Sequence, residues 1–278
     1  MAEDREDDLW LPYRGLFRPG MTRRELRELD RERGIHSLIE RRREHGARTR
    51  PRDRSLTRAD IVAAAMRVAD AEGVDAVSMR RVARELHAGA MSLYWHVESK
   101  EDLQDLMLEQ VEAEVQAPEP SGDWRADLRV FAHNVRTAML RHPWAMDFVR
   151  LRPPSGPNDA RNADRLFAIF DGLGLDIATT IRLATTFGIY VNGAVQNEIR
   201  EVRGEREMTR ATAEMTAAEL EALRGEFERR VRESGRYPHI VKLMEAGIDP
   251  DDPATRGDRF DFGLGVVLDG IAAQLKRD

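Results

Sequence analysis

Apolar residues recur every three to four positions along most of this chain, the spacing that gathers side chains on one face of an α-helix. One such face lies between Thr57 and Gly73 and is built largely from small residues: Ile61, Ala64, Ala65, Val68 and Ala69. Thr57 and Asp60 stand at the spacing of a capping box, which begins a helix, and Gly73 ends it. The pattern predicts a closely packed helix over residues 57–72.

Two shorter helices follow and are joined by a tight turn. Ser78 can cap the first of them. Its apolar face consists of Val82, Ala83 and Leu86. The turn spans only residues 87–89, and the second helix carries Ser92, Tyr94, Trp95 and His96. Two short helices in this arrangement are typical of a helix-turn-helix, which places its second helix in a DNA groove. Ser99 then begins a fourth helix, over residues 100–116, that connects this motif to the rest of the chain.

A break rich in Pro, Gly and Ser at residues 117–122 precedes a second series of amphipathic segments. The predicted helices there cover residues 124–141, 142–151, 158–173, 177–203, 217–232 and 259–275. Residues 204–216 are polar, and we expect them to be flexible. The sequence has no alternating strand pattern and no internal repeat, so the predicted fold class is all-α.

The first 54 residues are predicted to form an N-terminal extension. Residues 1–20 show no sustained period, and the capping-box pair of Thr22 and Glu25 predicts a helix after them. Residues 41–54 then carry seven Arg in a segment broken by one Gly and one Pro. Such a segment is either a flexible basic arm that contacts phosphates or a minor groove, or a solvated linker. Its position directly before the helix-turn-helix slightly favours the arm.

The distribution of charge supports a nucleic-acid partner. The 278-residue chain has a formal net charge of −6. Residues 41–100, however, hold 13 Lys and Arg against 8 acidic residues, a net charge of +5, whereas residues 101–278 hold 23 against 32. The positive charge therefore coincides with the helix-turn-helix.

The composition argues against enzymes and membrane proteins. The absence of Cys excludes disulfides and thiolate metal sites, and no two of the seven His stand at metal-ligand spacing with an acidic partner. There is no Gly-rich phosphate loop and no nucleophile elbow, so we expect no enzymatic activity, no metal and no cofactor. The N-terminus lacks a signal-peptide pattern and no apolar run reaches membrane-spanning length. We therefore expect a soluble, cytoplasmic protein with no membrane partner.

The segment SMRRVARELHAGAMSLYWHVESKEDLQDLML, residues 78–108, resembles the DNA-binding head of the tetracycline-repressor (TetR) family of bacterial transcription regulators. The resemblance is carried by an apolar-Ala pair, a Leu, a tight turn, the string LYWHV and a Lys that opens the next helix. In the C-terminal part the resemblance is limited to the order of the helices, and it does not include the N-terminal extension. It implies a helix-turn-helix DNA-binding domain over 55–116 and a ligand-binding and dimerisation domain over 117–278, which follow the predicted extension over 1–54.

By resemblance, eight residues face DNA: Arg80, Ala90, Met91, Ser92, Tyr94, Trp95, His96 and Lys100. Arg80 suits a guanine edge and Lys100 a phosphate, and the nearby Arg81 and Arg84 are expected to stay available to solvent or phosphate. The alternative is that the apolar and aromatic members of this region form the core of the small domain. We expect that role for Leu93 and Val97, and a mixed role for Trp95.

Two departures from the family pattern concern the turn and the start of the reading helix. His87 occupies the turn position where the family usually has Gly, and it can adopt a left-handed conformation at some cost. Ala90 and Met91 offer no strong hydrogen bonds, so we expect an operator that differs from the tetracycline operator.

In this family the C-terminal domain holds a ligand pocket. The candidate pocket residues are Phe131, Val135, Trp144, Phe148, Phe167, Phe170, Phe187, Tyr190 and Asn197. Their aromatic side chains either line an apolar cavity or fill the core, and for any single residue the core is the default. Asn197 stands where the tetracycline-binding member of the family has a carboxylate, and the segment 143–149 lacks the His of that member. A metal–tetracycline chelate is therefore not expected.

Together with the resemblance, these features predict a homodimeric repressor that binds a palindromic operator on double-stranded DNA and leaves it when a small, largely apolar ligand fills the pocket. The helices at 177–203 and 259–275 are the expected dimer elements. Four glycines in them either permit close approach of a partner helix or only relieve packing within the chain: Gly188, Gly193, Gly263 and Gly270. Ligand binding is expected to move the helix at 100–116 and so change the separation of the two reading helices. The alternative is a small-molecule-binding or interaction protein of the same fold without operator control.

Overall fold

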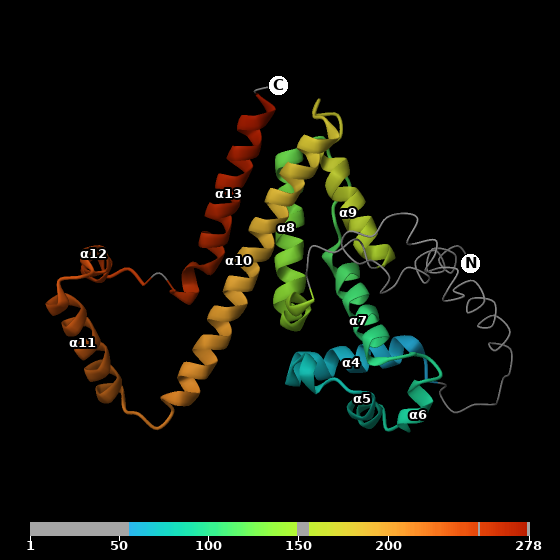
Figure 1. Ribbon diagram of the computed structural model, residues 1–278, viewed down its shortest axis with the longest axis horizontal. Coiled ribbons are helices and arrows are strands. Elements are labelled where there is room, and N and C mark those ends of the chain that lie inside the picture. Colours follow the sequence, from blue (N-terminus) through green and yellow to red (C-terminus); the bar gives the residue numbers. More distant parts are fainter. Residues whose placement is uncertain (1–55, 149–155, 250, 277–278) are drawn as a thin grey trace. The chain divides into compact units, whose positions relative to one another are not determined.

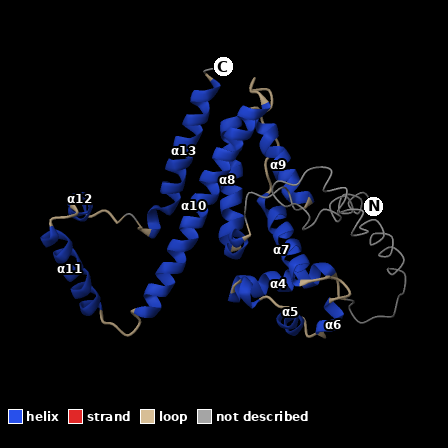
Figure 2. Cartoon of the chain, in the orientation of Figure 1, coloured by secondary structure: helices blue, strands red, loops and turns tan. Residues whose placement is uncertain are grey.

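The computed structural model describes residues 56–148, 156–249 and 251–276, which form helices joined by short loops (Figures 1 and 2). No strand occurs within these ranges, so the all-α prediction is confirmed. The predicted helix after Thr22 and the basic segment at 41–54 lie outside the described residues. The chain divides into two compact units, unit 1 up to Thr185 and unit 2 from Thr186 onwards.

Unit 1 begins with the helices of the predicted DNA-binding domain. They are α4 (Arg58–Glu72), the 3-10 helix η2 (Val74–Ala76), α5 (Met79–Glu85), α6 (Ala90–Leu93) and α7 (Lys100–Val115). The predicted caps are confirmed: Thr57 and Asp60 form the capping box of α4, and the hydroxyls of Ser78 and Ser99 accept backbone hydrogen bonds at the starts of α5 and α7. Gly73 ends α4 with a φ of 87°, a conformation that suits glycine.

The apolar faces of these helices meet in a small core. α4 packs against η2, α5 and α7, and α5 packs against α6. The fully or almost fully buried side chains include Ile61, Ala64, Ala65, Val68, Val77, Val82, Leu93 and Leu103. The predicted face of α5 is confirmed for Val82 and Ala83, whereas Leu86 is half-buried. Alanine on α4 removes side-chain volume at the contact, which lets the neighbouring helices approach closely.

The rest of unit 1 consists of α8 (Trp124–Arg141), the 3-10 helix η3 (Pro143–Asp147), α9 (Pro157–Phe170) and the first residues of α10 (Ile177–Ala211). α7 packs against both α8 and α9. Its buried residues are four positions apart: Leu103, Met107, Val111 and Val115. α8 has the predicted bounds. Pro143 has no amide hydrogen to continue α8, and in the described part of 142–151 the predicted short helix is a 3-10 helix.

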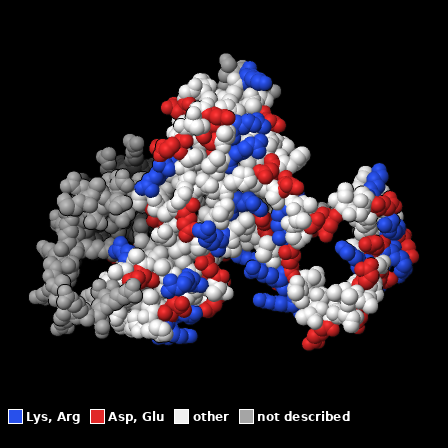
Figure 3. Space-filling view, turned by 180° about the vertical axis from the view of Figure 1, so that it is seen from behind, with Lys and Arg blue, Asp and Glu red and all other residues white. Residues whose placement is uncertain are grey.

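Unit 2 contains the remainder of α10, then α11 (Ala217–Ser234), α12 (Pro238–Ala246), the 3-10 helix η4 (Pro253–Thr255) and α13 (Arg256–Leu275). The buried apolar residues of α10 and α13 recur at helical spacing: Phe187, Val191, Val195 and Ile199, then Phe260, Leu264, Leu268 and Ile271. The Tyr190 hydroxyl joins the two helices by donating to the Phe260 carbonyl over 2.6 Å. α11 and α12 pack against each other, and acidic and basic side chains interleave over their surface in the view of Figure 3.

Two helix predictions for the C-terminal half were wrong. α10 continues to Ala211, although residues 204–216 are expected to be flexible, because Glu, Arg and Met in this stretch are strong helix formers. α12 was not predicted, since its nine residues are too few for a clear apolar period. Its ends do carry signals, Pro238 at its first position and Gly247 in a left-handed conformation after its last.

Gly263 allows the close approach of Tyr190 to α13. A Cβ atom at this position would lie 2.7 Å from the Tyr190 Cε2 atom and 2.9 Å from its Cζ atom. Of the two roles expected for this glycine, packing within the chain is therefore seen at Gly263, and a role in a dimer contact stays a prediction. At Gly188, Gly193 and Gly270, by contrast, an added Cβ would meet no atom of the described residues within 4 Å.

We expect Gly263→Ala to lower the free energy of unfolding by about 1–2 kcal/mol, because the overlap with Tyr190 outweighs the better helix propensity of Ala. The matched control is Gly265→Ala on the same helix, where an added Cβ has open space, and this variant should be as stable as the parent or slightly more so. Urea unfolding of both variants measures the difference. Equal stability of the two would show that Tyr190 moves aside without cost.

Candidate functional site

The turn of the helix-turn-helix is built around His87. Its φ of 51° is left-handed, as expected for a residue at a usual glycine position. The His87 amide donates to the Arg84 carbonyl over 3.2 Å, and the Ala88 amide donates to the Ala83 carbonyl over 2.9 Å. Local backbone hydrogen bonds therefore set the direction in which the chain leaves α5.

Residues 90–97 follow the turn, and we call them the reading segment. α6 ends at Leu93 and the next three residues form a turn, so the predicted helix over 90–96 is shorter than expected. The amides of His96 and Val97 donate to the Leu93 carbonyl over 2.9 and 3.0 Å. Leu93 and Val97 are buried, as predicted, and Arg58 Nε donates to the His96 carbonyl over 3.1 Å. The reading segment is thus anchored at two side chains and tied to the first turn of α4.

This anchoring turns the other side chains of the reading segment outwards. Met91, Tyr94 and Trp95 have exposed fractions of 74%, 48% and 83%. Ser92 is exposed as well, and Ala90 and His96 are half-buried. The expected share of Trp95 in the core is therefore wrong, because Leu93 and Val97 fill that core and the turn directs the indole into solvent.

Basic side chains flank the reading segment. Arg80 is exposed on α5, and Lys100 is the first residue of α7. Arg81, expected to be available to phosphate, instead pairs with Glu72 over 2.6 Å and with Glu85 over 3.0 Å. Its hydrogen bond lowers the pKa of the Glu72 carboxyl. Arg81 therefore holds α5 to α4, a role that its position in the sequence does not reveal.

The nine predicted ligand-binding residues fall in both units. In unit 1, Phe131, Trp144 and Phe170 are buried, Val135 and Phe148 are half-buried, and Phe167 is exposed. In unit 2, Phe187 is buried, whereas Tyr190 and Asn197 line a pocket. The structure thus brings Tyr190 and Asn197 together within one unit, and ligand binding by the full set stays a prediction.

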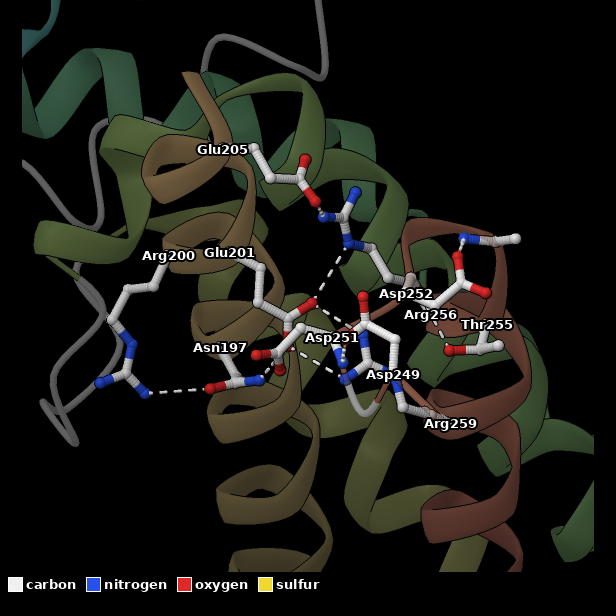
Figure 4. Close-up of polar contacts among 11 residues, drawn as sticks. Asn197, Arg200, Glu201, Glu205, Asp249, Asp251, Asp252, Thr255, Arg256 and Arg259 are labelled. Atoms are coloured by element: carbon white, nitrogen blue, oxygen red, sulfur yellow. Dashed lines mark hydrogen bonds and ion pairs between the residues drawn. The ribbon is translucent and has the colours of Figure 1, made fainter. Parts of the chain in front are cut away.

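The pocket in unit 2 lies between α10 and α13 and has a volume of about 300 Å³. Its lining residues are Tyr190, Ala194, Asn197, Glu198, Glu201, Arg256, Arg259, Phe260 and Gly263. Glu201 lies at the centre of its polar end, as Figure 4 shows, and its carboxylate accepts hydrogen bonds from Asn197 (2.6 Å), Arg256 (3.2 Å) and Arg259 (2.7 Å). One end of the pocket is therefore aromatic and the other is charged.

At the charged end of the pocket, the negative charge of Glu201 is compensated by its arginine partners. Burial opposes ionisation of Glu201, but the hydrogen bonds from Arg259 and Arg256 outweigh it and lower the pKa of this carboxyl. Burial raises the pKa of the Tyr190 hydroxyl, which stays a neutral donor to the Phe260 carbonyl. Sequence reasoning missed Glu201 and its two arginines, because their partners are more than fifty residues away along the chain.

Two family models match the chain. The model described as "Bacterial regulatory proteins, tetR family" matches residues 61–106, and the model described as "Tetracyclin repressor-like, C-terminal domain" matches residues 117–275. The chain belongs to the TetR family. The resemblance seen in residues 78–108 is confirmed, and so is the architecture of a helix-turn-helix domain followed by a larger helical domain.

Individual TetR-family proteins are similar over most of the chain. The HTH-type transcriptional repressor DrrR1 of Streptomyces coeruleorubidus is 35% identical over 78% of this chain and 77% of its own length. An HTH-type transcriptional regulator of Saccharopolyspora erythraea is 36% identical over 66% of this chain and 79% of its own. The crystal structure of ActR from Streptomyces coelicolor in complex with actinorhodin is 27% identical, with a TM-score of 0.58, and covers 80% of this chain and 98% of ActR.

This TetR-family chain is a DNA-binding transcriptional repressor, as predicted. The family consists of transcriptional regulators and not of enzymes. In the part of the chain that the structure describes, no helix combines the length and the apolar character needed to cross a lipid bilayer.

The last helix of the DNA-binding domain, α7, carries the half-buried Glu112, whose environment the sequence pattern did not reveal. Burial raises the pKa of Glu112 to about 7, and repulsion from Asp159 adds to the effect. The Asn162 side-chain amide donates to the Glu112 carboxyl over 3.0 Å and to its backbone carbonyl over 2.8 Å. The hydrogen bond to the carboxyl favours its ionised form, but burial outweighs it, so the folded chain favours the protonated carboxyl and stability is lost as the pH rises from about 4.5 to about 7.

Glu112→Gln cannot ionise, so we expect its free energy of unfolding to rise relative to that of the parent as the pH increases through this window. The gain should reach up to about 3 kcal/mol above pH 7 and vanish below pH 4.5. Denaturant unfolding at pH 4.5, 6 and 8 measures it, with exposed Glu101→Gln on the same helix as a control for the loss of one charge. A constant difference between Glu112→Gln and the parent across all three pH values would contradict the buried-carboxyl interpretation.

Proposed function

We propose that this repressor is a homodimer that reads a palindromic operator through its two reading segments. The proposed DNA contacts are Arg80, Ala90, Met91, Ser92, Tyr94, Trp95, His96 and Lys100. The observation that carries the proposal is the outward orientation of Met91, Tyr94 and Trp95 on a segment anchored by buried Leu93 and Val97. A solvent-exposed indole and thioether have no structural use in the head itself, and side chains of this kind can contact bases and phosphates.

The proposed domains are the extension at 1–54, the DNA-binding domain at 55–116 and the ligand-binding and dimerisation domain at 117–278. A four-residue helix with its following turn contacts few bases. Useful specificity therefore requires two reading segments that contact half-sites about one turn of the DNA double helix apart. As a regulator of operator DNA, the protein would act in the cytoplasm.

The proposed dimer interface is formed by α10 and α13. Both helices expose large apolar side chains: Ile181 and Ile189 on α10, and Phe262 and Val266 on α13. Apolar residues exposed at helical spacing on adjacent helices favour burial against a partner. Gly188, Gly193 and Gly270 leave open space in the chain where a partner helix can approach.

The proposed inducer is a small, largely apolar molecule bound in the C-terminal domain. ActR has been solved in complex with actinorhodin, which supports a ligand site in this fold. Tyr190 and Asn197 line the pocket of unit 2, and the other predicted residues, Phe131, Val135, Trp144, Phe148, Phe167, Phe170 and Phe187, remain candidates. Ligand binding would move α7 and change the separation of the two reading segments.

Selection of genomic fragments by the purified protein at physiological salt tests this function as a whole. We expect an inverted repeat upstream of a small number of genes. Recovery of fragments without a shared motif would favour the alternative, a ligand-binding or interaction protein of the same fold without operator control.

Tyr94→Ala and Lys100→Ala should each weaken operator binding about tenfold, because each removes a hydrogen-bond donor to DNA. The matched control is Tyr237→Ala, which truncates another exposed tyrosine in unit 2. Gel shifts measure the affinity, and circular dichroism confirms that each variant is folded. Unchanged affinity in both head variants would refute the assignment of the reading segment.

Val266→Asp should weaken dimerisation by one to two orders of magnitude, because it places a charge in the proposed apolar interface. Val130→Asp on α8 is the control, since Val130 is also an exposed valine within a helix. Sedimentation equilibrium gives the dissociation constant of each variant. Dimers of equal strength in both variants would place the interface elsewhere.

A further inference from the structure

One carboxylate of the DNA-binding head is hydrogen-bonded to the segment that follows α8. The Trp144 indole Nε1 donates to Asp70 Oδ1 over 2.7 Å, and His142 Nδ1 lies 2.8 Å from the same oxygen. Asp70 belongs to the last turn of α4, whereas His142 and Trp144 flank the start of η3. These contacts lie within unit 1 and join residues more than seventy positions apart.

The two donors are buried, so the contacts with Asp70 are costly to lose. Trp144 is 3% exposed and His142 is 5% exposed. A buried indole N–H without an acceptor loses its hydrogen bonds to water without replacement, and an ionised acceptor makes the bond stronger than a neutral one. The indole and imidazole rings also lie against each other, with centroids 5.9 Å apart. The arrangement therefore fixes the C-terminal end of α4 against η3.

A second carboxylate brings α7 to the same point. His142 Nε2 lies 3.3 Å from the Glu114 carboxylate, and Arg141 pairs with Glu114 over 2.8 Å. Glu114 is in the last turn of α7, the helix that follows the reading segment. α4, α7 and η3 thus meet at a single cluster of Asp70, Glu114, Arg141, His142 and Trp144, which we call the joint.

α4 connects the joint to the reading segment. Asp70 lies at one end of this helix, and Arg58, at the other end, donates to the His96 carbonyl in the reading segment. Asp70 lies twelve positions after Arg58, which corresponds to about 18 Å along the helix at a rise of 1.5 Å per residue. A tilt of α4 by about 10° at the joint would therefore move the reading segment by roughly 3 Å.

We propose that Asp70 is a positioning residue that sets the orientation of the DNA-binding head through Trp144 and His142, and that the joint determines the spacing between half-sites that the repressor accepts. The proposal rests on the proposed function, in which a dimer reads two half-sites. Asp70 itself does not contact DNA in this scheme. Loosening the joint leaves each head able to bind a half-site but lets the two heads adopt a range of separations.

This role predicts that loss of the joint affects the affinity for a full operator much more than the affinity for a single half-site. For Asp70→Ala and Trp144→Phe, affinity for the full operator should fall about tenfold, because the second half-site is no longer presented at a fixed distance. Affinity for a DNA with a single half-site should change less than about twofold. The preference of the parent for the natural spacer over spacers longer or shorter by one base pair should also shrink about tenfold.

Three further variants separate positioning from general damage. Trp124→Phe makes the same chemical change in a half-buried indole of α8 outside the joint, and it should keep the spacer preference of the parent. Asp70→Asn retains an acceptor oxygen for the indole, so it should restore part of the preference that Asp70→Ala loses. The double variant Asp70→Ala, Trp144→Phe should be no worse than Asp70→Ala alone, because both changes break one contact.

Fluorescence anisotropy with full operators of three spacer lengths and a half-site duplex provides the measurement. Loss of spacer preference with half-site binding retained supports the joint. Equal weakening on half-site and full operator, or an unchanged preference in Trp144→Phe, overturns it, and Trp144→Phe decides the matter if Asp70→Ala does not fold. A parent protein that binds full operator and half-site equally would overturn the dimeric mode of reading itself, a failure distinct from that of the joint.

Discussion

The apolar stripe of α7 is the constraint on which unit 1 depends. The buried side chains of α7 are four residues apart, and the helix packs against α4, which precedes it in the sequence, and against α8 and α9, which follow it. A repeat of four residues drifts slowly around a helix of 3.6 residues per turn, so one stripe can serve several neighbours in succession. The same helix that completes the core of the head therefore also belongs to the core of the larger domain. A displacement of α7 cannot remain confined to either.

Local features of this chain were predictable because their causes lie within a few residues. Thr57, Ser78 and Ser99 cap the helices that their spacing predicts, and His87 adopts the left-handed conformation expected at a glycine position. The exposure of Trp95 was not predictable in this way. An aromatic residue next to two core residues has an ambiguous pattern, and only the turn after Leu93 decides which way its side chain points.

Features that depend on distant partners were harder still. Arg81 of α5 pairs with Glu72 of α4, and Glu201 accepts hydrogen bonds from arginines of α13. Neither role can be predicted from the neighbouring residues in the sequence. The same holds for Gly263, whose lack of a side chain accommodates the Tyr190 ring within the chain. Family resemblance supplied the architecture and the class of function. It did not supply these contacts, because each is a property of particular side chains in this chain.

The way in which the reading segment is held has a consequence for how such a repressor can change its target. Backbone hydrogen bonds, two buried side chains and one arginine on α4 fix its shape, and none of these uses the side chains at 91, 92 or 95. Those positions are therefore free to vary in sequence without a penalty in folding. New operator specificities can therefore arise by substitutions at the surface of the head while its scaffold stays constant.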